Sequence, residues 1–70
     1  MSITSLLLTD DYLYRMMINC LGKNKTLDYA VSLMQHQLRK KGLLMLNNGS
    51  FISKRDIRRA MKELYARGKE

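Results

Sequence analysis

Apolar residues recur every three or four positions in three stretches of this chain, and the residues between them are mostly polar or charged. This spacing places the apolar side chains on one face of an α-helix, since a helix turns by about 100° per residue. The pattern predicts three amphipathic helices, over residues 9–21, 26–41 and 53–67. Their apolar stripes consist of Leu13, Met16, Met17, Cys20 and Leu21; of Leu27, Ala30, Val31, Met34 and Leu38; and of Ile57, Ala60, Met61, Leu64 and Tyr65.

Capping signals support the ends of these helices. The residues that can cap their amino termini are Thr9, Thr26 and Ser53. Asp56 stands three residues after the last of them, which completes a capping-box pattern. Gly42 suits the left-handed position that follows a helix, and residues 39–41 place three cations in the last turn of the second helix, where they complement its dipole.

The stretch between the second and third helices contains a short apolar run and a turn signal. Residues 43–46 are too few for another helix after a glycine stop, and Asn48-Gly49 tolerates the positive φ angles of a type I′ turn. We therefore expect a short β-hairpin over residues 43–52, with an irregular loop that buries two leucines as the alternative. The expected cross-strand neighbours are Leu46 with Phe51 and Met45 with Ile52.

Together these elements predict a mainly α fold, a three-helix small domain with a short, wing-like β-hairpin between the second and third helices. Seventy residues make one domain at most, so we expect a single domain over residues 1–70. Such a short chain lies near the lower limit of independent stability, and its single cysteine, Cys20, cannot form an internal disulfide. A homodimer is therefore a further expectation, and the lone thiol fits a reducing compartment.

The chain carries a formal net charge of +7, and the excess lies in its second half. Residues 1–38 hold three basic and three acidic side chains, whereas residues 39–70 hold ten basic and three acidic ones. This asymmetry is typical of a surface that binds a polyanion. The ordinary solvated surface of a small helical protein is the alternative explanation.

Catalytic chemistry has few candidate residues here. His36 is the only histidine and Cys20 the only cysteine, and Asp10 and Asp11 are adjacent, so on a helix they diverge by about 100°. The sequence has no glycine-rich phosphate loop and no serine elbow. We therefore expect no enzyme activity, no metal and no cofactor. The amino-terminal apolar run is too short for a signal peptide or a membrane span, which predicts a cytoplasmic protein with no membrane partner.

The segment "LRKKGLLMLNNGSFISKRDIRRAMKELYARG", residues 38–68, resembles the winged part of MerR-type regulators and phage excisionases. In those families a helix ends in a basic turn with "KGL", a wing follows, and a helix that opens with an acidic–isoleucine pair like "RDI" packs behind it. The resemblance implies a winged-helix fold that binds DNA, with residues 39–41 and the wing tip at 47–50 approaching phosphates.

A second resemblance covers residues 8–43, where "LTDDYL" is followed by "TLDYAVSLMQHQLRKKGL". These stretches are similar to the sporulation histidine-kinase inhibitors of the Sda family. Members of that family are short antiparallel helical hairpins that grip the dimerisation helices of a kinase. The resemblance implies that the residues between Leu21 and Val31 form the tip that faces the kinase.

Two hypotheses for the function follow. The first is a small regulator of a bacterium or phage that binds DNA, or RNA, by neutralising phosphates, while Gln35 or Gln37 reads base edges. Its candidate nucleic-acid-binding residues are Gln35, Gln37, Arg39, Lys40, Lys41, Asn48, Lys54, Arg55, Arg58, Arg59 and Lys62. The second is a protein-binding inhibitor of a histidine kinase or of RNA polymerase. Candidates for its apolar contact face are Tyr14, Ile18, Leu33 and residues 6–8.

Overall fold

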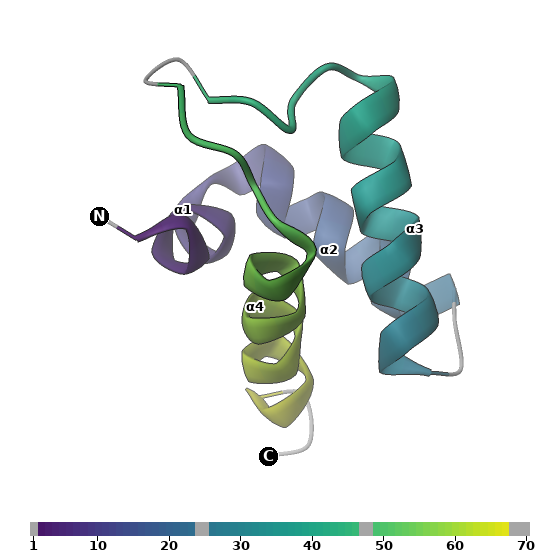
Figure 1. Cartoon of the computed structure of the whole chain (residues 1–70). Helices are drawn as coiled ribbons and strands as arrows, with labels where there is room; N and C mark the ends of the chain where they lie inside the picture. The colour runs from purple at the N-terminus through teal and green to yellow at the C-terminus, as the bar shows by residue number, and fades with distance from the viewer. Residues whose placement is uncertain (1, 24–25, 47–48, 68–70) are drawn as a thin grey trace.

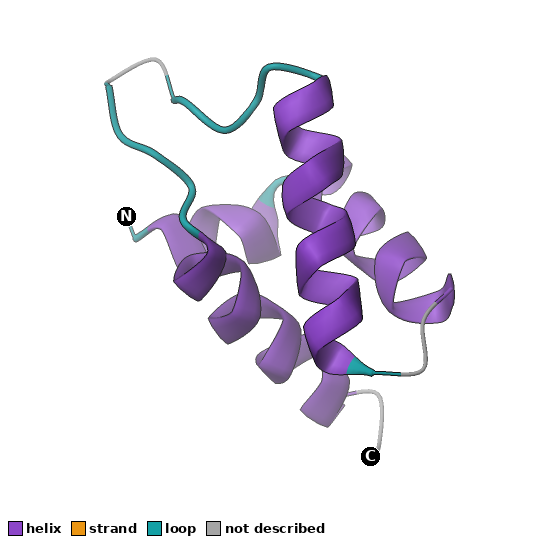
Figure 2. Ribbon diagram, turned by 45° about the vertical axis from the view of Figure 1, so that its right-hand side comes forward, coloured by secondary structure: helices purple, strands orange, loops and turns teal. Residues whose placement is uncertain are grey.

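The computed structural model describes residues 2–23, 26–46 and 49–67, which fold mainly into α-helices. The four helices are α1 (Ile3–Thr9), α2 (Asp11–Lys23), α3 (Leu27–Lys40) and α4 (Lys54–Arg67). In Figure 1, α4 lies between α1 and α3, and α2 runs behind them. Figure 2 shows α3 and α4 side by side in front of the two amino-terminal helices. Both α2 and α4 pack against each of the other three helices.

The prediction of three helices is wrong, because an additional helix, α1, precedes them. Ser2 caps α1, since its Oγ accepts a hydrogen bond from the N–H of Ser5 at 3.1 Å. Asp10 ends α1 and caps α2, because its carboxylate accepts the N–H of Leu13 at 3.0 Å. The hydroxyl of Thr9, the predicted cap, instead donates to the carbonyl of Ser5 within α1.

The two ends of α3 follow the signals in the sequence. Thr26 caps the amino terminus, where its Oγ1 accepts a backbone N–H of the first turn at 3.2 Å. At the carboxyl terminus the N–H of Leu43 donates to the carbonyl of Leu38 at 2.8 Å, and the N–H of Gly42 donates to the carbonyl of Arg39 at 3.1 Å. This pair of bonds is a Schellman motif, and it requires the positive φ of 70° that Gly42 adopts.

The predicted β-hairpin between α3 and α4 is also wrong. The described part of this connection contains no strand, only one isolated antiparallel bridge between Met45 and Phe51. Two backbone hydrogen bonds of 2.7 Å keep the same register, from the N–H of Leu46 to the carbonyl of Ser50 and from the N–H of Ile52 to the carbonyl of Leu44. Met45, rather than Leu46, therefore lies opposite Phe51.

The position of the positive φ angle explains this change of register. Gly49 has a φ of 87°, and its N–H donates to the carbonyl of Leu46 at 3.0 Å. The loop that closes the bridge therefore spans three residues, with a left-handed glycine at its third position, instead of the two of a type I′ turn. Asn48, the other half of the predicted turn, lies outside the described residues.

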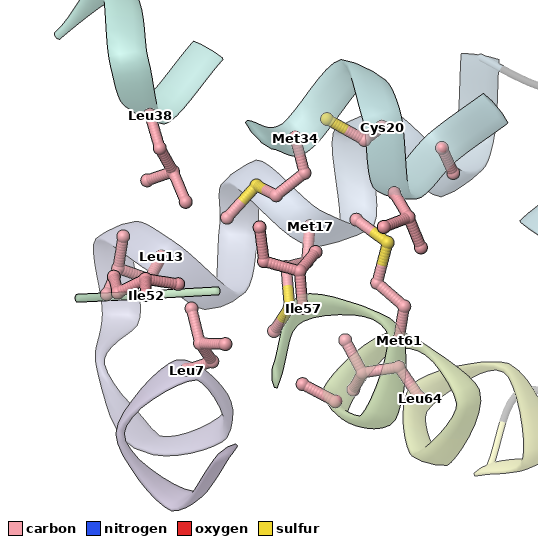
Figure 3. Packing of buried hydrophobic residues seen from close by; sticks show 13 residues of the cluster. Leu7, Leu13, Met17, Cys20, Met34, Leu38, Ile52, Ile57, Met61 and Leu64 are labelled. Carbon is pink, nitrogen blue, oxygen red and sulfur yellow. The ribbon is translucent and has the colours of Figure 1, made fainter. Parts of the chain in front are cut away.

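The core fills the space between the four helices (Figure 3). Every helix contributes at least one completely buried side chain, and the connection before α4 contributes Ile52. The buried residues are Leu7, Leu13, Met17, Cys20, Ala30, Val31, Met34, Leu38, Ile52, Ile57, Ala60, Met61 and Leu64. Complete burial of one leucine, isoleucine or methionine stabilises the folded state by about 1.5–3 kcal/mol, so this cluster is the main source of stability.

Leu7 tests whether the unforeseen helix α1 is part of the cooperative fold. Because Leu7 is fully buried, Leu7→Ala should lower the free energy of unfolding by about 2–4 kcal/mol in urea denaturation. The matched control is Ile18→Ala on α2, whose side chain is 43% exposed and which should cost less than about 1 kcal/mol. Equal effects of the two substitutions would show that α1 is not docked.

Candidate functional site

The capped first turn of α4 and its buried side chains determine which residues form the outer face of this helix. The capping box predicted for this helix is confirmed: Ser53 Oγ accepts the N–H of Asp56 at 3.2 Å, and the Asp56 carboxylate accepts the N–H of Ser53 at 3.3 Å. Ile57, Ala60 and Met61 are completely buried against the other helices. Because a helix turns by about 100° per residue, burial of these three positions determines which residues of α4 point to solvent.

Three exposed cations stand on the solvent side of α4 and a fourth is exposed at its amino end, and we name the four together the α4 basic face. Arg55, Arg59 and Lys62 lie about 140–160° around the helix from Ile57, and Lys54 is exposed at its amino end. The α4 basic face consists of Lys54, Arg55, Arg59 and Lys62. Within the described residues, none of the four lies within 4.0 Å of a carboxylate.

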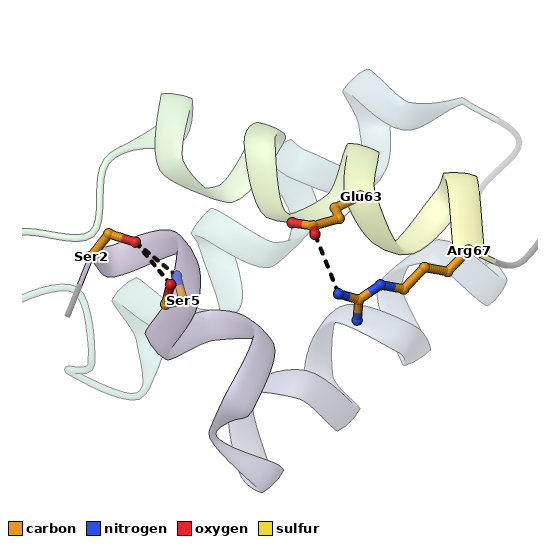
Figure 4. A network of polar contacts seen from close by, with 4 residues as sticks. All are labelled: Ser2, Ser5, Glu63 and Arg67. Carbon is orange, nitrogen blue, oxygen red and sulfur yellow. Dashed lines mark hydrogen bonds and ion pairs between the residues drawn. The ribbon is translucent and has the colours of Figure 1, made fainter.

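The two carboxylates on α4 lie on the flank next to Arg59 and have partners of their own. Asp56 is part of the capping box, and Glu63 accepts a hydrogen bond from Arg67 at 3.2 Å, one turn further along (Figure 4). Both are about 100–120° from Ile57, on the flank opposite to the one that carries Arg58. Among the described residues, neither carboxylate is therefore paired with a cation of the α4 basic face.

Arg58 is held in the seam between α3 and α4. Its guanidinium forms an ion pair with the carboxylate of Asp28, in the first turn of α3. Both side chains are partly exposed, so the pair adds little to stability. Its effect on the surface is electrostatic, because Asp28 neutralises a cation that would otherwise extend the α4 basic face.

The other predicted residues divide between two sides of α3. Gln35 and Arg39 follow Asp28 by seven and eleven residues, which is close to two and three helical turns. They therefore lie on the same side of α3 as Asp28, the side that faces α4. Gln37 and Lys41 instead line a groove between α2 and α3, on the opposite side. Lys40 is exposed at the end of α3. The eleven predicted residues thus do not form one surface, and Asn48 lies outside the described residues.

The groove between α2 and α3 was not foreseen as a site. It encloses about 590 Å³, and Lys41 Nζ stands 5.9 Å from the ring centre of Tyr12 at one end. Its lining residues are Asp11, Tyr12, Arg15, Met16, Asn19, Cys20, Lys23, Leu33, Gln37 and Lys41. The basic residues of α2 recur at helical spacing in the sequence, but a sequence does not show which helix faces them.

A second, apolar groove lies between the amino-terminal helices and the connection that precedes α4. It encloses about 540 Å³. Its lining residues are Leu6, Asp10, Tyr12, Leu13, Leu43, Met45, Leu46 and Ile52. Met45 and Phe51, the residues of the isolated bridge, are 56% and 61% exposed beside it. Of the predicted apolar contact residues, Ile18 is exposed, whereas Tyr14 and Leu33 are half-buried and pack against the core.

Other kinds of site are not found in the described part of the chain. No three histidine, cysteine or acidic side chains are arranged to hold a metal ion. No described helix has the length and apolar character needed to cross a bilayer. Burial raises the pKa of the Cys20 thiol above its ordinary value, and the nearby Lys23 ammonium offsets part of this rise.

Comparisons with known proteins give no further guide to the site. No family model, curated protein or solved structure matches the chain. The resemblances to MerR-type regulators, excisionases and Sda-type inhibitors therefore stay hypotheses. The wing that the first of them implies is not present as a pair of strands in the described residues.

The raised pKa of Cys20 predicts a pH dependence of stability. The unfolded chain loses the thiol proton near the ordinary pKa of 9.0, while the folded protein keeps it to higher pH. The folded state therefore loses stability as the pH rises above about 9. Below that value, the stability that depends on the protonated Cys20 thiol is fully present. Between about pH 8 and pH 10, the unfolding free energy should fall more in the native sequence than in Cys20→Ala. Identical pH profiles would contradict this.

Proposed function

We propose that the protein is a small cytoplasmic regulator, of a bacterium or a phage, that binds nucleic acid through the α4 basic face. The observation that carries the proposal is the sorting of charge on α4. Lys54, Arg55 and Lys62 are exposed and unpaired with described carboxylates, whereas the acidic residues nearby serve caps or ion pairs. A surface of this kind attracts a polyanion because counterions are released when phosphates take their place.

The dimensions of the face suit a phosphate backbone. Arg55 and Lys62 are seven residues apart, which corresponds to about 10 Å along the helix axis, with Arg59 between them. Phosphates of one DNA strand follow each other at about 3.4 Å along the duplex axis, so the length covered by the three cations corresponds to about three phosphate steps of one strand.

Base reading is not part of this proposal. Gln37 lies in the groove between α2 and α3, away from α4, and Gln35 is half-buried. Sequence is read by groups that reach base edges, while contacts to phosphate only position a protein on the duplex. We therefore expect binding that depends strongly on salt and weakly on sequence, and we expect no catalytic step.

Charge reversal on α4 tests the proposal directly. With four phosphate contacts, the logarithm of the association constant should fall with the logarithm of salt concentration at a slope of about −4. Arg55→Glu combined with Arg59→Glu should halve this slope and weaken binding to duplex DNA by at least about tenfold in fluorescence anisotropy at low salt.

The matched control reverses two cations elsewhere. Arg15→Glu combined with Lys40→Glu causes the same change in net charge, but neither residue belongs to the α4 basic face. This variant should keep most of the affinity and most of the salt slope. If both double variants lose affinity equally, attraction is due to net charge alone and the proposed face is wrong.

Asp28→Asn should increase affinity, because it releases Arg58 from its ion pair and adds one cation beside the α4 basic face. The salt slope should become steeper by about one unit. Asp11→Asn is the matched control, since Asp11 also lies in the first turn of its helix but lines the groove between α2 and α3. Equal gains for the two variants would contradict a specific role of Arg58.

The exposed apolar residues favour a second candidate function, an inhibitor that binds a protein such as a histidine kinase or RNA polymerase. Leu43, Met45 and Phe51 are exposed beside the apolar groove, where a partner would bury them. In a pull-down from nuclease-treated bacterial lysate, Met45→Asp with Phe51→Asp would then remove the partner, and the Arg55 and Arg59 reversals would not. The first proposal predicts no stoichiometric protein partner after nuclease treatment.

A further inference from the structure

The groove between α2 and α3 is separate from the α4 basic face. Gln35 and Gln37 are two residues apart, which places them about 160° apart around α3. Gln37 lines the groove with residues of α2, whereas Gln35 lies on the side of α3 that carries Asp28 and its partner on α4. A ligand in the groove would therefore leave the α4 basic face free.

The groove combines an apolar floor with polar walls. Cys20 is buried and Met16 and Leu33 are half-buried, so these three side chains form its apolar part. Asn19 from α2 and Gln37 from α3 contribute a side-chain amide on each wall. An amide presents a donor and an acceptor together, which is the pattern that pairs with the edge of a purine base.

Three cations line the groove and only one carboxylate does. Arg15 and Lys23 come from α2 and Lys41 from the end of α3, while Asp11 is the single acidic lining residue. In the described part of the chain, no ion pair joins any of these four side chains to another residue. The lining therefore has a net positive charge, which favours an anionic ligand.

We propose that this groove binds a purine mononucleotide. The base lies on the apolar floor, where its ring system covers Met16 and Leu33, and the amides of Asn19 and Gln37 bond its edge. The phosphates contact the cations of the rim. A volume of about 590 Å³ lies within the range of about 300–1,000 Å³ that small-molecule sites occupy, and the polar and charged side chains that form most of the lining suit a ligand that carries phosphate.

A titration with four probes tests this assignment: AMP, ATP, adenosine and inorganic phosphate. AMP and ATP should bind saturably below about 1 mM, and adenosine and phosphate should each bind at least about tenfold more weakly, because each lacks one half of the ligand. In ¹H–¹⁵N NMR spectra the side-chain amide signals of Asn19 and Gln37 should shift with AMP. Equal binding of phosphate and AMP would overturn the base-binding part of the proposal.

Substitutions then locate the site. Gln37→Glu adds a carboxylate to the wall and should weaken AMP binding by at least about tenfold. Lys41→Ala removes a cation from the rim and should weaken it by about threefold. The control is Arg59→Glu with Lys62→Glu on the α4 basic face, which should leave AMP affinity within about twofold. If the control weakens AMP binding and the groove variants do not, the nucleotide binds to α4 and the groove is not its site. Absence of saturable AMP and ATP binding would also overturn the proposal.

Discussion

Burial of one side of α4 is the constraint on which the rest of the molecule depends. Ile57, Ala60 and Met61 are completely enclosed, and α4, like α2, contacts each of the other three helices. A helix with three such positions cannot rotate about its axis without exposing them, at a cost of several kcal/mol. Core packing therefore fixes the direction of the charged residues on the same helix, although those residues take no part in the core themselves.

The second feature is how the few carboxylates are used. Asp10 and Asp56 cap helices, while Asp28 and Glu63 pair with arginines. Each of these roles has a local structural reason, since helix amino termini favour negative charge and ion pairs form between neighbours. Their combined result is that cations on the outer side of α4 stay without a carboxylate partner among the described residues. A basic surface can thus arise from the placement of the acidic residues as much as from the number of basic ones.

Several local signals in the sequence predicted local structure correctly, whereas the cap at Thr9 and the β-hairpin were wrong. The cap at Thr26, the capping box at Ser53 and the positive φ of Gly42 depend on neighbours within four residues. Helix α1 was missed because its apolar run is short, although Ser2 as a cap offered a signal. The candidate site was split because the sequence alone does not reveal which neighbour each side of α3 meets, although the spacing of Gln35 and Gln37 already places them about 160° apart on a helix.

The central claim is that the outer side of α4, rather than positive charge in general, contacts nucleic acid. The most direct measurement is the rate at which acetic anhydride acetylates each lysine, read by mass spectrometry with and without duplex DNA at low salt. Bound DNA should protect Lys54 and Lys62 several-fold, and Lys23 should react at an unchanged rate. Equal protection of all three lysines, or protection of Lys23 alone, would contradict the account.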